Sequence, residues 1–367
     1  MGKRKDFSQS ITQALRDSSF SMMKTNGQVV LGITEEYDLA DKLKRIEYLV
    51  KRIGKSEGDL FWVKIGIHGR PYMAKNRLGD NFYSESKYLV LLKEHYPFHQ
   101  FAPHVDVFVR HVEEMKVGDI CLDGFLFDEV KEGIHLFNEC VRRIRSEVNS
   151  KDFADEVSKN LRRVNKNFKE LNDYIKALFR NCARLVVLRI DLAYLNKYGE
   201  NALKDTAITY DDVKKHREQW LRDLREKLLP ESMVGYAWKL EYGLEKNYHY
   251  HVMVFLDGSK VRQDVTIAML IGEHWMNKVT GGKGLYYNCN ANKEGYRYCG
   301  IGVVNHDDEE KRMSLMRAAM YLTKLDYYIK LVASDSGKTF SKGNWPKPTC
   351  LGRPRKKTVK GVISNTT

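Results

Sequence analysis

One short segment, a strand with two histidines one residue apart, constrains the fold of this chain more than any other. The segment YHYHVMVFLDG (Tyr248 to Gly258) alternates its side chains between two faces, because successive residues of a strand point to opposite sides of the sheet. His249 and His251 therefore share a face at roughly 7 Å between their Cα atoms, close enough for both imidazoles to bind one ion. The opposite face is an apolar stripe suited to a core, formed by Tyr250, Val252, Val254 and Leu256.

A carboxylate from the preceding strand is expected to join the two imidazoles. Residues 233–243, MVGYAWKLEYG, read as a second strand, and the loop LEKN after it is short enough for a hairpin. If the loop centres on Glu245, Glu241 lies opposite His249 with the Cβ atoms about 5 Å apart. The neighbouring even register places it opposite His251 instead. Only an odd register or a bulge would turn Glu241 to the other face.

Two imidazoles and one carboxylate form a ligand set that leaves coordination positions open. We predict that Glu241, His249 and His251 bind a divalent ion, Mg²⁺ or Mn²⁺, whereas zinc fits phosphate chemistry in solution less well. The alternative is a solvent-facing glutamate beside two structural histidines.

The segments before this hairpin predict an α+β domain with an antiparallel core. Residues 151–180 form an amphipathic helix that we expect to dock the front half onto the rest. The segment ARLVVLRIDLAY reads as a buried strand, on which Arg189 and Asp191 suit either a site-lining role or an ordinary strand-end charge. A helix begins after Thr209, with Asp212 in its first turn. Strand, helix, hairpin and helices together give the α+β class.

Residues 1–150 combine helices with one hairpin and contain no convincing catalytic constellation. DLADKLKRIEYLVKRI reads as a helix and DLFWVKIGIHGRPYMA as the hairpin. Four histidines follow, but Pro97 and Pro103 interrupt a regular helix there, so we interpret them as surface or core residues rather than ligands. We expect residues 1–150 to form a mostly helical accessory domain of unknown role. The four histidines are His95, His99, His104 and His111.

A helix near the C-terminal end carries reactive side chains on one face. In DDEEKRMSLMRAAMYLTKLDYYIKLVA the acidic residues suit a helix N-terminus, and an apolar stripe runs through Ile329. On a separate face, Arg317, Tyr321, Lys324 and Tyr328 recur at helical spacing. A tyrosine pKa of about 10 makes the phenol a poor nucleophile, so it needs a metal-polarised electrophile or a nearby cation that stabilises the phenolate, and Lys324 can supply that charge. Without the histidines, packing is the simpler role for Tyr321.

The charge of the chain favours a polyanionic partner. A formal net charge of +14 suits phosphate contacts and the release of counterions from nucleic acid. No apolar run approaches a membrane span and no apolar segment follows the basic N-terminus, so we expect a cytoplasmic protein without membrane contact. The six cysteines contain no CxxC pair, and we expect reduced thiols. A basic tail at residues 351–367 carries further candidate DNA contacts, namely Arg353, Arg355, Lys356 and Lys357.

In chain order, the strand LVVLRIDLAY, the His249-Tyr250-His251 motif and the helix with Tyr321-Leu322-Thr323-Lys324 resemble the three motifs of the HUH rolling-circle replication endonucleases. The blocks GYAWKLEYG, YHYHVMVFLDG, IGEHWMNKVTGGKGLYYNCNA and AAMYLTKLDYYIK further resemble inovirus gene-II-type replication proteins, the YagK/YfjJ C-terminal domain family. The resemblance covers about residues 180 to 350. It implies an antiparallel-sheet HUH endonuclease domain (Rep-like, with a ferredoxin-like or RRM-like core) over residues 181–350.

The activity implied by this resemblance is nicking of single-stranded DNA at a replication origin of a phage or prophage. Glu241, His249 and His251 would hold the ion, Tyr321 would attack the scissile phosphate, and Lys324 would steady the charge. Tyr328 is a candidate second tyrosine, and Arg317 a candidate DNA contact. Single-stranded or supercoiled origin DNA would be the partner, with host helicase and replication proteins as further partners. Residues 1–150 would recognise duplex DNA or a partner protein, so that their deletion abolishes origin selection but spares cleavage of short single strands. The alternative is a non-catalytic DNA-binding regulator or accessory protein that retains the fold.

Overall fold

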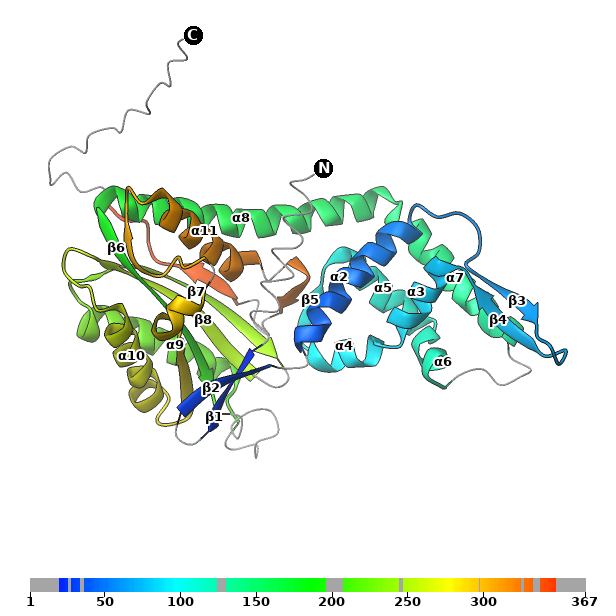
Figure 1. Ribbon diagram of the computed structural model, residues 1–367, viewed down its shortest axis with the longest axis horizontal. Coiled ribbons are helices and arrows are strands. Elements are labelled where there is room, and N and C mark those ends of the chain that lie inside the picture. Colours follow the sequence, from blue (N-terminus) through cyan, green and yellow to red (C-terminus); the bar gives the residue numbers. More distant parts are fainter. Residues whose placement is uncertain are drawn as a thin grey trace, which may run out of the picture.

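The computed structural model describes two parts that lie side by side along the longest axis of the molecule, a helical N-terminal part and a sheet-containing C-terminal part (Figure 1). For residues 20–25, 28–33, 36–38, 122, 123 and 324 it describes the backbone alone. The described residues are 20–25, 28–33, 36–123, 130–195, 207–243, 247–296, 298–324, 327–332 and 337–347.

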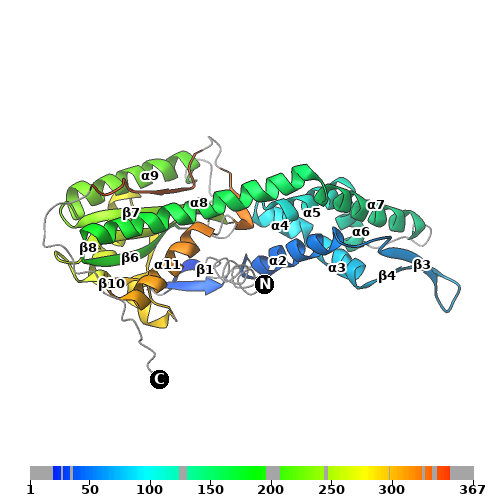
Figure 2. The ribbon, with the colours of Figure 1, turned by 90° about the horizontal axis from the view of Figure 1, so that it is seen from above.

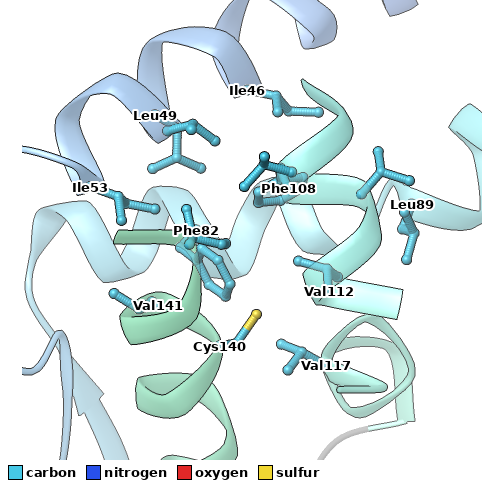
Figure 3. Packing of buried hydrophobic residues seen from close by; sticks show 14 of the residues in the cluster. Ile46, Leu49, Ile53, Phe82, Leu89, Phe108, Val112, Val117, Cys140 and Val141 are labelled. Atoms are coloured by element: carbon cyan, nitrogen blue, oxygen red, sulfur yellow. The ribbon is translucent and has the colours of Figure 1, made fainter. Parts of the chain in front are cut away.

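The N-terminal part is built from short helices around one apolar core. Because amphipathic helices bury one stripe each, α2, α3, α5 and α7 bring aliphatic and aromatic side chains together (Figure 3). The helix and the hairpin expected from the sequence are both present, and the chain between α4 and α5 is interrupted at the two prolines as predicted. The helices are α2 (Glu36–Ile53), α3 (Arg77–Ser86), α4 (Leu89–His95), α5 (Pro103–Glu114), α6 (Val117–Asp123) and α7 (Val130–Val148).

Three small two-stranded sheets are present among the described residues, and the one formed by β1 and β2 lies beside the C-terminal part, where β1 contacts β9 (Gly284–Asn288) (Figure 1). The hairpin of β3 and β4 projects from the far end of the helical part (Figure 1). A different pair joins the two parts, because β5 pairs with β11 from near the C-terminal end of the described chain. The strands are β1 (Phe20–Thr25), β2 (Gln28–Ile33), β3 (Phe61–Ile65), β4 (Pro71–Lys75), β5 (His99–Phe101) and β11 (Ile329–Leu331).

A single long helix, α8 (Lys151–Asn181), runs along both parts (Figure 2). Ser150 caps its N-terminus, since its side chain accepts a hydrogen bond from the backbone N–H of Phe153. Phe153 belongs to the N-terminal core, whereas Leu171, Tyr174 and later residues pack in the C-terminal part. The helix therefore contributes to both cores.

The C-terminal part is built on an antiparallel sheet, six-stranded over the described residues. Its order is β10-β6-β8-β7-β12, and β9 pairs with the second half of β6. Every described pairing in the sheet is antiparallel, which agrees with the predicted α+β class. The strands are β6 (Arg184–Tyr194), β7 (Met233–Gly243), β8 (Asn247–Asp257), β9 (Gly284–Asn288), β10 (Gly302–Asn305) and β12 (Phe340–Lys342).

Helices cover both faces of this sheet. The face with Tyr250, Val252 and Val254 packs against α9 and α10, while the face with Met253 and Phe255 packs against α8 and α11. Thr209 caps α9 in a capping box with Asp212, as the sequence predicts. The helical segments are α9 (Tyr210–Asp223), η3 (Leu224–Leu228), α10 (Asp264–His274), η4 (Trp275–Val279), η5 (Cys289–Gly295) and α11 (Glu309–Lys324).

The helix with the predicted reactive stripe is shorter than expected. It ends at Lys324, and Ile329 already belongs to strand β11, so the expected continuation of α11 through Ile329 is wrong. Tyr328 is consequently not on the face of Tyr321; its side chain is fully buried in the N-terminal core. Pairing of β11 with β5 replaces the last helical turns, because tertiary contacts override local helical spacing here.

Within the described part of the chain, no helix combines the length and apolarity that a membrane crossing requires. The five described cysteines are free thiols, and Cys350 lies outside the described residues.

Candidate metal centre

Glu241, His249 and His251 meet at one end of the central sheet. In the hairpin of β7 and β8, Glu241 lies directly opposite His249, which is the first of the two even registers that the sequence left open. No bulge turns Glu241 to the other face of the sheet, because the register shift in this pair of strands lies near Met233. One ligand atom from each of the three side chains lies within 4.8 Å of the other two.

Hydrogen bonds orient both imidazoles toward the glutamate. The Nδ1–H of His251 donates to Asp191 Oδ1 at 2.6 Å, and the Nδ1–H of His249 donates to the carbonyl of Asn247 at 3.1 Å. Both Nε2 atoms then face Glu241 Oε2, at 3.5 Å from His249 and 3.3 Å from His251. Such partners at Nδ1 fix the tautomer and leave the Nε2 lone pair for a metal.

The charges of the cluster are mutually dependent and buried. Burial opposes the ionised form of Asp191, but the neighbouring His251 and Arg189 charges outweigh it and lower the pKa of Asp191. Likewise, burial disfavours imidazolium at His251, yet Asp191 and Glu241 raise its pKa. The two imidazoles also lower the pKa of Glu241 against the effect of burial. An extra positive charge is therefore stabilised at this position.

The three side chains fit a bound divalent ion. Bonds of 2.0–2.2 Å at angles of 90–110° place neighbouring ligand atoms roughly 2.8–3.6 Å apart, and the 3.3 and 3.5 Å separations fall in this range. Glu241 Oε1 and the Nε2 atoms of His249 and His251 are buried without a hydrogen-bond partner among the described residues. Because buried polar atoms are rarely left unpaired, a ligand that satisfies all three is indicated.

Helix α11 crosses the same face of the sheet as the three ligands. Leu315, Ala319 and Leu322 of α11 pack with Met253 and Phe255, which share a strand face with His249 and His251. Tyr321 is half-buried and packs against the N-terminal core, at the boundary between the two parts.

The other predicted site residues either belong to α11 or lie outside the described part of the chain. Arg317 is exposed and its guanidinium lies 3.8 Å from the ring centroid of Tyr298. The backbone of Lys324 forms the last residue of α11. The predicted tail contacts Arg353, Arg355, Lys356 and Lys357 lie outside the described residues.

A histidine from the N-terminal part borders the metal centre. Burial and the charge of Lys239 lower the pKa of His99 to about 4, and Glu241 and His249 also act on it electrostatically. Because β5 contains His99 and pairs with β11, the chain just after α11 reaches the same end of the sheet as the ligands. Tyr321 and strand β11 therefore both contact the N-terminal part.

Sequence reasoning left Asp191 open and missed Lys239 and His99. Asp191 lies opposite His251 on β6, and its contact with Nδ1 decides for the site-lining role. Lys239 lies opposite His251 on β7 and is buried, with 2% of its surface exposed. Its position two residues before Glu241 on the same strand face was a usable signal. No local signal places His99 there.

An α+β chain with two histidines and a glutamate converging on an antiparallel sheet defines a candidate metal-dependent protein. The family model of the YagK/YfjJ C-terminal domain matches residues 147–340, and the chain belongs to this family. The match begins before α8, so this helix is part of the family domain. No curated protein and no solved structure is significantly similar to the chain.

Proposed function

We propose that this protein is an HUH-type endonuclease that nicks single-stranded DNA at an origin and rejoins it through a covalent tyrosine intermediate. The observation that carries the proposal is the convergence of Glu241, His249 and His251, with both Nε2 atoms buried and aimed at one point. A net charge of +14 supports a nucleic-acid substrate.

The order of elements also supports this assignment. The chain runs β6, α9, β7, β8, α10 and then β9 and β10, a β-α-β-β-α-β succession typical of ferredoxin-like domains. In space β6 and β8 occupy the centre, which puts the ligand-bearing strand β8 between β6 and β7. Central strands make a rigid base for a site that must hold a phosphate in one geometry.

In the proposed reaction Tyr321 Oη attacks the scissile phosphorus, and the bond from phosphorus to the 3′ oxygen breaks. The phenol loses its proton and the departing 3′ oxygen gains one, which leaves a 5′-phosphotyrosine and a free 3′-OH. Glu241, His249 and His251 would hold a Mg²⁺ or Mn²⁺ ion, which supplies Lewis-acid polarisation of the phosphate. Lys324 would steady the phenolate. Reversal by the 3′-OH rejoins the strand without loss of phosphodiester energy.

The test uses a supercoiled plasmid that carries the intergenic DNA flanking the gene, incubated with full-length protein and Mn²⁺. Relaxed plasmid with covalently attached protein is expected from the wild type, and Tyr321→Phe should give neither. Tyr72→Phe, which removes a phenol from the exposed hairpin strand β4, is the matched control and should nick normally. Nicking by Tyr321→Phe at the wild-type rate would show that another group is the nucleophile.

The same experiment also tests the alternative function, that of a DNA-binding protein without nicking activity. If the wild type binds the intergenic DNA but leaves the plasmid supercoiled with Mg²⁺ and with Mn²⁺, the regulator or accessory role takes the place of the endonuclease.

A further inference from the structure

A cavity of about 200 Å³ lies at the hairpin end of β7 and β8, on the side of the sheet opposite the candidate metal centre. Most of its wall is aromatic. Ring centroids of Phe98 and Tyr242 are 5.0 Å apart, those of Tyr242 and Tyr248 are 4.9 Å apart, and Tyr210 lies 6.0 Å from Tyr248. Tyr194 completes this set, which we call the aromatic cavity.

The aromatic cavity and the metal centre belong to adjacent residues of the same two strands. Tyr242 follows Glu241, and Tyr248 precedes His249, so each pair points to opposite faces of the sheet. The carbonyl of Asn247, another residue of the cavity wall, accepts the hydrogen bond that orients His249. A nucleotide chain with one phosphate at the metal centre would have to pass the end of this hairpin to reach the cavity.

The size and chemistry of the cavity suit one planar ring. Its volume is below the range of about 300–1,000 Å³ typical of pockets for drug-sized ligands. Aromatic cavities also bind quaternary ammonium groups, but no acidic side chain lines the described wall, and Lys214 Nζ lies 5.5 Å from the Tyr210 ring. A ring linked to an anionic backbone is the better match to this charge.

We propose that the aromatic cavity binds one unstacked base of the single-stranded DNA, next to the nucleotide whose phosphate lies at the metal centre. This inference rests on the proposed nicking function, since it assigns a base-binding site to the same substrate. Phe98 and Tyr248 form the accessible side of the cavity, because Phe98 is 40% exposed and Tyr248 is half-buried, whereas Tyr210 and Tyr242 are buried.

Photocrosslinking in EDTA tests this site without any cleavage. A short oligodeoxythymidine carrying 5-iododeoxyuridine is crosslinked to the full-length protein, and the modified residue is identified by peptide mass spectrometry. The expected product is modified at Phe98, Tyr210, Tyr242 or Tyr248. Crosslinks confined to residues outside the aromatic cavity would overturn the inference.

A double variant, Phe98→Ala with Tyr248→Ala, gives the second measurement. Because stacking of a base on aromatic side chains contributes about 1–3 kcal/mol, its affinity for the unmodified oligonucleotide should fall about 5- to 150-fold. Tyr48→Ala, at a residue 63% exposed on α2, is the control and should bind as the wild type does. Wild-type affinity in the double variant would also overturn the inference.

The outcomes separate this inference from the proposed reaction. Crosslinking at the aromatic cavity in a protein that never nicks DNA would support the base-binding site and contradict the proposed endonuclease activity. Normal nicking by a protein that crosslinks only outside the aromatic cavity would support the proposed endonuclease activity and contradict the base-binding site.

Discussion

At the scale of single residues, the candidate site depends on which ring nitrogen of each histidine is already bonded. Asn247 and Asp191 accept from the two Nδ1 atoms, and this leaves Nε2 of His249 and His251 directed at Glu241. A histidine pair on a strand becomes a ligand pair only when such acceptors are in place.

Replacement of Asp191 by Asn tests this orientation. The variant removes the carboxylate that fixes His251, so affinity for Mn²⁺ should fall about 10- to 100-fold, as is typical when the partner of a metal-bound histidine is lost. Isothermal titration calorimetry measures the change. Asp173→Asn, on the solvent-facing side of α8, is the control and should bind Mn²⁺ as the wild type does. If Asp191→Asn binds Mn²⁺ with the affinity of the wild type, the result would argue against the metal centre.

The pH dependence of stability is expected to follow His104, a partly buried residue that packs on the edge of the N-terminal core. Burial and the nearby Lys51 lower the pKa of His104 to about 4, and its ring packs 5.0 Å from that of Phe153. The folded pKa is below that of the unfolded chain, so the neutral ring stabilises the fold fully above about pH 6.5. This contribution is lost as the pH falls toward 4.

Thermal unfolding between pH 7 and pH 4 measures this effect. His104→Gln should show a smaller decrease of Tm with falling pH than the wild type, although His99 titrates in the same window and keeps part of the slope. The exposed His135→Gln on α7 should leave the wild-type slope unchanged. A slope in His104→Gln equal to that of the wild type would mean that His104 does not control it.

At the scale of elements, the position of α11 decides where Tyr321 stands. The helix packs so closely on the chain before β10 that a Cβ atom at Gly300 would overlap the backbone of Ser314 and Leu315. Only glycine fits under this helix without moving it.

Gly300→Ala is therefore expected to displace α11 and to destabilise the fold by about 1–3 kcal/mol, the usual cost of overpacking. Nicking should fall with it, because the candidate nucleophile is carried on the displaced helix. Urea unfolding and the plasmid assay report the two effects. Gly295→Ala is the matched control, since a Cβ atom there meets no neighbour within 4 Å.

At the scale of the whole molecule, the two parts are joined through packing that crosses the junction. Tyr328 is buried in the N-terminal core, Tyr321 packs against it, and β11 pairs with β5. The N-terminal part is thus a structural support for the end of α11, in addition to any role in DNA recognition.

This packing changes the expected result of removing residues 1–150. The sequence alone led us to expect that cleavage of short single strands survives the deletion. In the structure the deletion exposes Phe153 and Tyr328 to water, which lowers the free energy of unfolding by about 1.5–3 kcal/mol for each side chain. It also removes β5, the strand that pairs with β11. We now expect a lower Tm and loss of cleavage on a short oligonucleotide. Full cleavage by the truncated chain would show that the junction is not needed.

The sequence by itself determined strands β6, β7 and β8, the hairpin of β7 and β8, and the three side chains that converge at the candidate metal centre. Side-chain direction in a strand has a period of two, and a short loop limits the register, so Glu241, His249 and His251 could be placed on one face without knowledge of the rest. The capped α9 was predictable for a similar local reason.

Only the tertiary structure decided where α11 ends and what borders the site. The spacing of Tyr321 and Tyr328 fits a continuous helix, but whether the helix continues depends on the pairing of Ile329 with Phe101, far away in the sequence. The approach of His99 to the ligands follows from the same pairing. Such contacts form because distant segments gain more free energy from pairing and burial than from local propensity, and no periodicity within one segment records that gain.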